Sequence, residues 1–193
     1  MKLKYLSQIT SVLLILITIY ACNNNEYNNL VESELKKNIT YDSLFLGISL
    51  DMGKKDFYTH CWEMNKKGFI RQGPNNLSVQ YAIDSGELRH SGFMHFYPEF
   101  EENKISMMPM QFTYEAFTPT DSTYYSSSLL LDVKNMLERW YGGNDFIYLE
   151  NEQGNKSLWV KVDGNRRIRI FKKGIRIVAA DIMDLRKIKS DEK

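Results

Sequence analysis

The sequence predicts an α+β domain made of two halves, each a helix followed by antiparallel strands, with the helices packed on one face of an antiparallel sheet. Three observations lead to this fold class. Apolar residues recur at helical spacing in two stretches, about 53–67 and 121–141. Between and after these stretches, apolar and polar residues alternate with the period of a strand. Short turns rich in Gly, Asn and Asp separate the last strands, as in antiparallel hairpins.

The first half, about 41–120, is expected to open with a helix. A short apolar run, Leu44–Ile48, is followed by Asp51, whose carboxylate can accept from the free amides of a first helical turn. We therefore expect Asp51 to cap a helix over about 53–67. Gly68 follows that stretch and suits the left-handed position after a last turn.

Three strands are expected after this helix. The stretch Leu77–Ile83 alternates strictly between apolar and polar residues, as a half-buried strand does. The stretches 93–100 and 105–117 are rich in aromatic residues and methionine and are predicted to form two more strands. Pro98 and Pro109 cannot donate to a ladder, so they indicate strand ends, bulges or edges.

The second half, about 121–187, repeats the plan. A helical unit begins at Asp121 and carries an apolar stripe that ends at Gly142, with hydroxyls at 126–128 expected to cap it. The strands that follow are predicted over 146–150, 157–162, 167–171 and 175–182. The two halves show no residue identity that would make them a sequence repeat.

The N-terminus carries the pattern of a secretory signal. Lys2 and Lys4 precede an uncharged stretch whose most apolar part is Val12–Ile19. A membrane-spanning helix would need roughly 20 predominantly apolar residues. Polar residues dilute the stretch, and three asparagines follow it at 23–25. We therefore expect residues 1–21 to be a removed leader.

The residues at the end of this leader, Ile19-Tyr20-Ala21-Cys22, resemble the lipobox of bacterial lipoproteins. The resemblance implies that the Cys22 thiol carries a diacylglycerol and that the new amine is acylated. Such chains anchor a protein to a membrane without spanning it. Asn23 stands where aspartate favours inner-membrane retention, and no acidic run of a surface-export signal follows. The resemblance therefore implies the outer membrane and a periplasm-facing orientation.

The rest of the chain is expected to be a flexible tether over 22–40, a single domain over 41–187 and a tail over 188–193. The helix entry Leu46-Gly47-Ile48-Ser49-Leu50-Asp51-Met52 looks like that of small secreted lipoproteins of Bacteroidetes. The halved plan is similar to the β-lactamase inhibitory protein fold and to small outer-membrane assembly lipoproteins. This resemblance implies a fold and a binding role, and it transfers no functional residue.

No catalytic constellation emerges from the sequence. The histidines are His60, His90 and His95, and none forms a helical zinc pair, so we expect neither a metal nor another cofactor. The acidic group Glu99, Glu101 and Glu102 is interpreted as a solvated loop. Cys61 falls on the expected first helix. With Cys22 claimed by lipid it has no disulfide partner, and we interpret it as a packing residue.

The clearest surface feature is a basic hairpin. Its alternation is expected to turn the arginines outward and the isoleucines, including Ile175 and Ile177, inward. This face is either the ordinary solvent side of a sheet or a contact for an anionic partner, such as an acidic protein, a glycan or lipid headgroups. The candidate interaction residues are Arg167, Arg169, Phe171, Lys172, Lys173 and Arg176.

We therefore predict a membrane-anchored, non-enzymatic binding or assembly module of the bacterial envelope. Two alternatives remain open: an inhibitor or immunity-type protein that blocks a periplasmic hydrolase, and a hydrolase whose site the sequence does not reveal. A formal net charge of +1 gives no reason to expect nucleic acid.

Overall fold

The computed structural model describes residues 26–150 and 157–187. Its elements in chain order are a helix over 26–36, α2 (Lys54–Lys66), β1 (Ile70–Gln72), η1 (Pro74–Asn76), β2 (Val79–Ile83), β3 (Gly92–Phe96), β4 (Glu99–Glu101), β5 (Lys104–Tyr114), η2 (Ser122–Tyr124), α3 (Ser126–Tyr141), β6 (Ile147–Glu150), β7 (Ser157–Asp163), β8 (Arg166–Lys173), β9 (Ile177–Asp184) and η3 (Leu185–Lys187).

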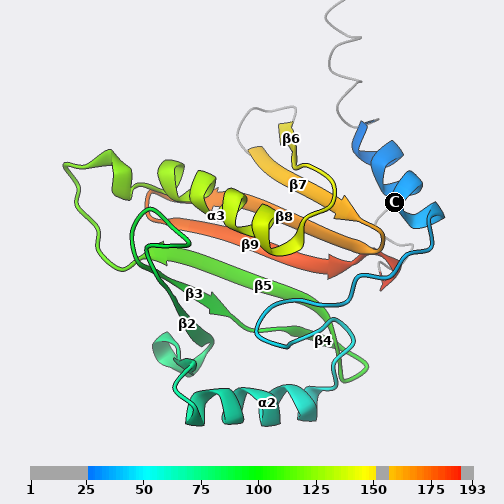
Figure 1. Ribbon diagram of the computed structural model, residues 1–193, viewed down its shortest axis with the longest axis horizontal. Coiled ribbons are helices and arrows are strands. Elements are labelled where there is room, and N and C mark those ends of the chain that lie inside the picture. The colour runs from blue at the N-terminus through cyan, green and yellow to red at the C-terminus, as the bar shows by residue number, and fades with distance from the viewer. Residues whose placement is uncertain (1–25, 151–156, 188–193) are drawn as a thin grey trace, which may run out of the picture.

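The described strands form one nine-stranded antiparallel sheet, in the order β1-β2-β3-β5-β9-β8-β7-β6, with β4 also paired to β5. The predicted α+β class is confirmed. Each half is a helix followed by a run of antiparallel strands. The halves join in the middle of the sheet, where β5 pairs with β9 (Figure 1).

The main core lies between the sheet and α3, which crosses β8 and β9 (Figure 1). The apolar side chains of α3 repeat at helical spacing, so they form one stripe that faces the sheet. The sheet meets this stripe with every second residue of its strands. The buried members are Leu129, Val133, Met136 and Leu137 from α3, and Ile168, Ile170, Val178, Ala180 and Ile182 from the sheet.

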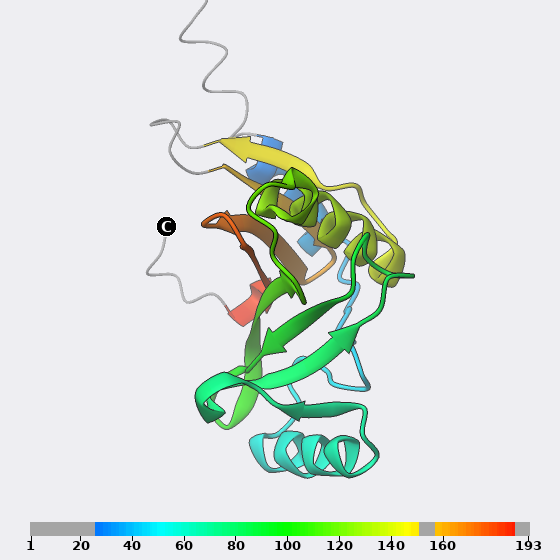
Figure 2. The same ribbon diagram turned by 90° about the vertical axis from the view of Figure 1, so that its left-hand side faces the viewer.

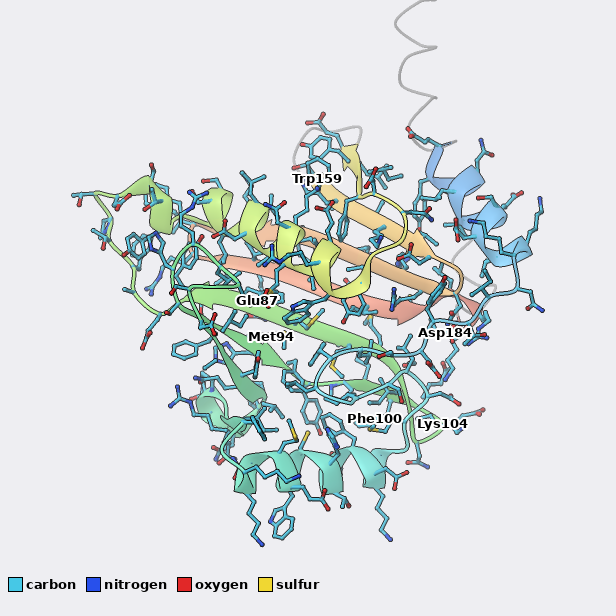
Figure 3. The ribbon with its side chains drawn as sticks, viewed as in Figure 1. Glu87, Met94, Phe100, Lys104, Trp159 and Asp184 are labelled. Atoms are coloured by element: carbon cyan, nitrogen blue, oxygen red, sulfur yellow. The ribbon has the colours of Figure 1, made fainter. Side chains whose placement is uncertain are left out.

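Helix α2 joins the same core through aromatic contacts. Phe57 is buried, and its ring lies 5.9 Å from that of Phe100, which Figure 3 shows between β4 and α2. The loop before α2 extends the core towards α3, because Phe45 contacts both Phe96 of β3 and Trp140 of α3. No α-helix of the described residues covers the opposite face of the central strands, which is on the left in Figure 2.

The helix ends agree with the sequence, whereas the helix starts do not. Gly68 has positive φ, as predicted, and Gly142 follows the last residue of α3, where the helix was predicted to end. The N-cap of α2 is Gly53 rather than Asp51, and no side chain caps it. Asp51 itself has positive φ and bonds to Lys104 and Lys187, and these hydrogen bonds lower the pKa of its carboxyl to about 2. The predicted cap is wrong, because Lys104 and Lys187 bind the carboxylate of Asp51 and it does not accept from the amides of the first turn of α2.

The hydroxyls at 126–128 also differ from the expectation. They lie inside the first turn of α3, whose N-cap is Tyr125, without a side-chain cap. The Ser126 hydroxyl donates to the carbonyl of Gly174, and that of Ser128 donates to the carbonyl of Ser122. These serines tie the helix start to neighbouring loops instead of capping it.

The strands follow the prediction with two differences. β1 was not expected, and the predicted strand over 93–100 is split into β3 and β4. Pro109 lies in β5, and its carbonyl accepts from the amide of Tyr97. The N–H and C=O of one residue point the same way in an antiparallel strand. The amide that Pro109 lacks therefore falls at the break between β3 and β4. The strand end predicted at Pro98 is confirmed, whereas Pro109 lies inside the central strand β5.

The β8–β9 hairpin corrects one part of the predicted pattern. Arg167 and Arg169 do face away from α3, as expected, and the guanidinium of Arg167 also bonds the Tyr27 hydroxyl of the 26–36 helix at 3.5 Å. Ile175, however, lies in the turn and is 55% exposed. Val178 pairs with Lys172 and is buried, so Ile177 falls on the opposite face from the core. The turn has three residues, as predicted, but it lies at 174–176 rather than 172–174, and the core-facing residues of β9 are Val178, Ala180 and Ile182.

The expected tether is part of the folded body over the residues that the structure describes. The helix over 26–36 contacts the domain through Glu34, which is buried and accepts from the amide of Gly164 (3.0 Å) and the Asn144 side chain (2.7 Å). The leader 1–21, Cys22, the turn near 152–154 and the tail 188–193 lie outside the described residues. Within the described ranges, no helix is long and apolar enough to cross a bilayer.

Candidate functional site: a groove on the sheet face opposite α3

A groove with a volume of about 980 Å³ crosses the face of the sheet opposite α3. One wall is formed by Pro74, Leu77 and Ser78 at η1 and the start of β2, and the other by Leu158 of β7 and Phe171 of β8. Its lining is mainly apolar with a few polar groups. That combination and size are typical of binding sites.

The depth of the groove comes from small or short side chains on the two central strands. Pro109 of β5 pairs with Asp181 of β9, and Gln111 pairs with Ala179. Ala179 lies between Gln111 and Phe171 in one row across the sheet. Because Ala179 reaches only one carbon above the backbone, the larger residues on either side of it form walls.

A bidentate ion pair lies in the floor of this groove. The guanidinium of Arg169 donates to both carboxylate oxygens of Asp181 over 2.9–3.1 Å. The side chain of Arg169 is 36% exposed and that of Asp181 is 10% exposed. The pair therefore meets its own hydrogen-bonding needs at the base of the groove while solvent still reaches it.

His95 also lines the groove. The amide of Gln80 contacts His95 Nε2 at 3.3 Å, and its other end contacts the guanidinium of Arg71 when the amide nitrogen points to His95. Burial lowers the pKa of His95, and in this orientation of the Gln80 amide Nε2 accepts the hydrogen bond. The hydroxyl of Tyr97 is bonded to that of Tyr58 at 2.6 Å.

Free charges stand at the two ends of the groove. Lys172 and Lys173 line one end, and Glu99 lines the other. Lys173 pairs with Ile177 of β9, whereas Glu99 pairs with Met107, which pairs with Met183 of β9. The two ends are therefore about 20 Å apart along the strands, at 3.4 Å per residue. None of these three side chains has an ion pair within the described part of the chain.

The structure separates the six candidate residues of the basic hairpin. Arg169, Phe171, Lys172 and Lys173 line the groove. Arg167 lies farther along the same face and contacts the sulfur of Met183 at 3.0 Å. Arg176 leaves the groove altogether and lies 4.6 Å above the ring of Phe117.

A second polar region, which the sequence did not predict, lies on the other face at the end of α3. We call Glu34, Lys161, Asp163, Asn165, Arg166 and Asp184 the polar cluster, and all six are buried. Figure 3 labels Asp184 at this end of the sheet, near the 26–36 helix. Lys161 donates to the carbonyls of Gly142 and Asn144, which follow α3, and lies 3.2 Å from Asp163. None of its members lines the groove, and their contacts join the 26–36 helix, the end of α3 and the β7–β8 hairpin.

The remaining chemical candidates are occupied by structural contacts. His60 bonds the carbonyl of Leu46, and His90 stacks on Tyr124. His90 Nε2 also bonds the Thr123 hydroxyl, which in turn donates to Asp121. This hydroxyl has one proton, so Nε2 must be the donor and cannot activate it. Burial raises the pKa of Cys61 to about 11, which keeps the thiol protonated.

Within the described ranges, no group of three His, Cys, Asp or Glu side chains could hold a metal ion. Asp181 is bonded to Arg169, and His95 to Gln80, so the groove holds a histidine and a carboxylate that each have another partner. No known protein family, no curated protein and no solved structure matches this chain. The groove is therefore interpreted from its own residues.

Proposed function

We propose that this protein is a lipid-anchored, non-enzymatic binding module of the bacterial envelope, and that the groove is its binding site for another envelope protein. The lipobox-like residues 19–22 support the anchor, the envelope and the outer-membrane location. The observation that carries the binding role is the groove itself: a largely apolar hollow on a face of the central strands that no described α-helix covers. Soluble domains rarely leave such a surface without a partner.

The polar groups of the groove support binding rather than catalysis. The side chains that could transfer protons, His95 and Asp181, are held by Gln80 and Arg169. Apolar contact with Leu77 and Phe171 supplies affinity, and the charged ends orient the partner.

The test is capture of partners by the full chain from solubilised envelopes, compared with a groove variant. Leu77 is 75% exposed on the groove wall, so Leu77→Asp changes the binding surface with little risk to the fold. The matched control is Ile175→Asp, because Ile175 is exposed but lies outside the groove. We expect a partner that wild type and Ile175→Asp retain and that Leu77→Asp loses.

Identical partners for all three proteins would refute the groove as the binding site. Capture of one hydrolase in a stoichiometric complex that stops its activity would replace an assembly role with the inhibitor alternative. Release of fatty acids, sugars or peptides from envelope material by the purified chain would overturn the non-enzymatic assignment.

A further inference from the structure

We infer that the occupant of the groove is an amphipathic helix of the partner protein, about 13 residues long, lying with its C-terminal end at Lys172 and Lys173. This inference rests on the proposed function and names the kind of segment that the same groove takes. Three properties of the groove support this inference: its hydrogen-bonding capacity, its length and its charge.

The first argument is that most hydrogen-bonding side chains in the floor of the groove are already bonded, which leaves the exposed amide of Gln111 for a ligand. Arg169 and Asp181 are bonded to each other, and His95 is bonded to Gln80. The site lies on the face of a sheet rather than at its edge, so the ligand meets side chains and cannot add a strand. An extended peptide would leave its own amides and carbonyls unpaired against Ala179 and Phe171. A helix pairs them internally.

The second argument is one of length and shape. The charged ends of the groove are about 20 Å apart along the strands, which a helix of about 13 residues spans at 1.5 Å per residue. The opposite face of the same sheet already holds α3, whose apolar stripe packs on β8 and β9. A partner helix in the groove would complete the second layer of the sheet.

The third argument is charge. A helix has a partial positive charge at its N-terminus and a partial negative charge at its C-terminus. The groove matches that dipole in one direction only, with Glu99 at one end and Lys172 and Lys173 at the other. An acidic residue in the last turn of the partner helix would add a direct pair with Lys173. This complementarity sets the polarity of the bound helix.

The experiment measures the binding of three fluorescent 16-residue peptides to the full chain in detergent. The first has leucines at positions i, i+3, i+4 and i+7, polar residues elsewhere and two glutamates in the last turn. The second replaces these glutamates by glutamine. The third has the composition of the first, but its leucines alternate with period two. Ala179→Trp fills the groove, so binding to this variant reports the detergent background.

We expect the first peptide to bind wild type at least tenfold more tightly than the third peptide does. Leu77→Asp should weaken this binding about tenfold, and Ile175→Asp should leave it unchanged. The double variant Lys172→Glu/Lys173→Glu should weaken the first peptide threefold to tenfold and the second less than twofold. The changes at Leu77, Ile175, Lys172 and Lys173 are at exposed residues, so the circular dichroism of these variants should match that of wild type.

Equal affinity for the helical and the period-two peptide would overturn the helix assignment. Palmitate tests a different occupant. If it binds saturably and displaces the first peptide more effectively than an excess of the second peptide does, the groove is a site for acyl chains instead. If no peptide binds while Leu77→Asp still loses its captured partner, the helix assignment fails and the proposed function stands. If no peptide binds and Leu77→Asp also retains its captured partner, the helix assignment and the proposed function both fail.

Discussion

The polar cluster and the groove take their charged residues from the same β-hairpins, yet one is sealed and the other is open to solvent. Arg166 and Arg169 are three positions apart in β8, and their side chains are 4% and 36% exposed. Strand alternation places Arg166 on the core side, where its guanidinium lies 4.4 Å from the ring of Tyr141, and Arg169 on the groove side. A basic run in a strand can therefore contain both structural and surface residues.

The difference predicts how stability responds to loss of a charge in each region, and the largest effect belongs to Lys161. Lys161→Met removes a 1% exposed cation that bonds two carbonyls beyond α3 and pairs with Asp163. Breaking a buried pair leaves its partner uncompensated, so we expect a loss of about 3–5 kcal/mol in the free energy of unfolding. Urea unfolding followed by circular dichroism measures it.

Lys36→Met is the control for this substitution. Lys36 pairs with Glu32 across one helical turn, and both side chains are largely exposed. Such pairs contribute about 0.3–0.5 kcal/mol. Similar losses in the two variants would mean that the polar cluster is no more sealed than the surface, and the contrast between the two regions would disappear.

The next largest effect is expected at Glu34, which attaches the 26–36 helix to the domain. In Glu34→Gln an amide NH₂ must face donors on Gly164 or Asn144, and we expect a loss of about 1–3 kcal/mol at pH 7. Hydrogen exchange should show faster exchange in residues 26–36. Exposed Glu32→Gln serves as the matched control.

This contribution should depend on pH in a defined direction. Burial raises the pKa of Glu34, but hydrogen bonds from Lys37, Gly164 and Asn144 outweigh it and leave the folded pKa below the ordinary 4.5. The stabilisation is therefore present above pH 4.5 and is lost as pH falls through the folded value. The difference between wild type and Glu34→Gln should shrink below pH 4, and a difference that grows there would contradict the assignment.

The smallest effect on stability is expected in the groove. Arg169→Met breaks the pair with Asp181, but solvent reaches the guanidinium and can hydrate the remaining carboxylate. We expect a loss of about 1 kcal/mol in thermal or urea unfolding. A loss as large as that for Lys161→Met would show that Arg169 is a structural residue, and the groove floor would then belong to the same class as the polar cluster.

Local patterns predicted much of this fold. The stripe of α3, the glycines that end both helices and the alternation of 167–171 each depend on neighbours in sequence, and they are confirmed. Asp51 failed as a predicted cap because its partners are remote: Lys104 and Lys187 hold its carboxylate. A sequence pattern cannot show such competition.

The candidate site was only half predictable for the same reason. The sequence pattern predicts that Arg169 and Phe171 share the outer face of one strand. The floor of the groove, however, forms where β5 pairs with β9, and the alternation of apolar residues does not show which strands pair. The opposite wall comes from Leu77, which was predicted to lie in a strand and instead projects from the turn after η1. Lys161 occupies a core-facing position of β7 because of carbonyls beyond α3, and an alternation pattern contains no sign of that partner.

The junction of β5 with β9 also determines when this domain can finish folding. The ribosome delivers β5 long before β9, so β5 waits with one edge unpaired and with Met108, Met110 and Phe112 lacking their cover from the second half. Pairing segments so distant in sequence is slow, because loop closure must precede the contacts that reward it. A chain that ends before residue 177 would therefore expose an incomplete, apolar sheet to aggregation and proteolysis.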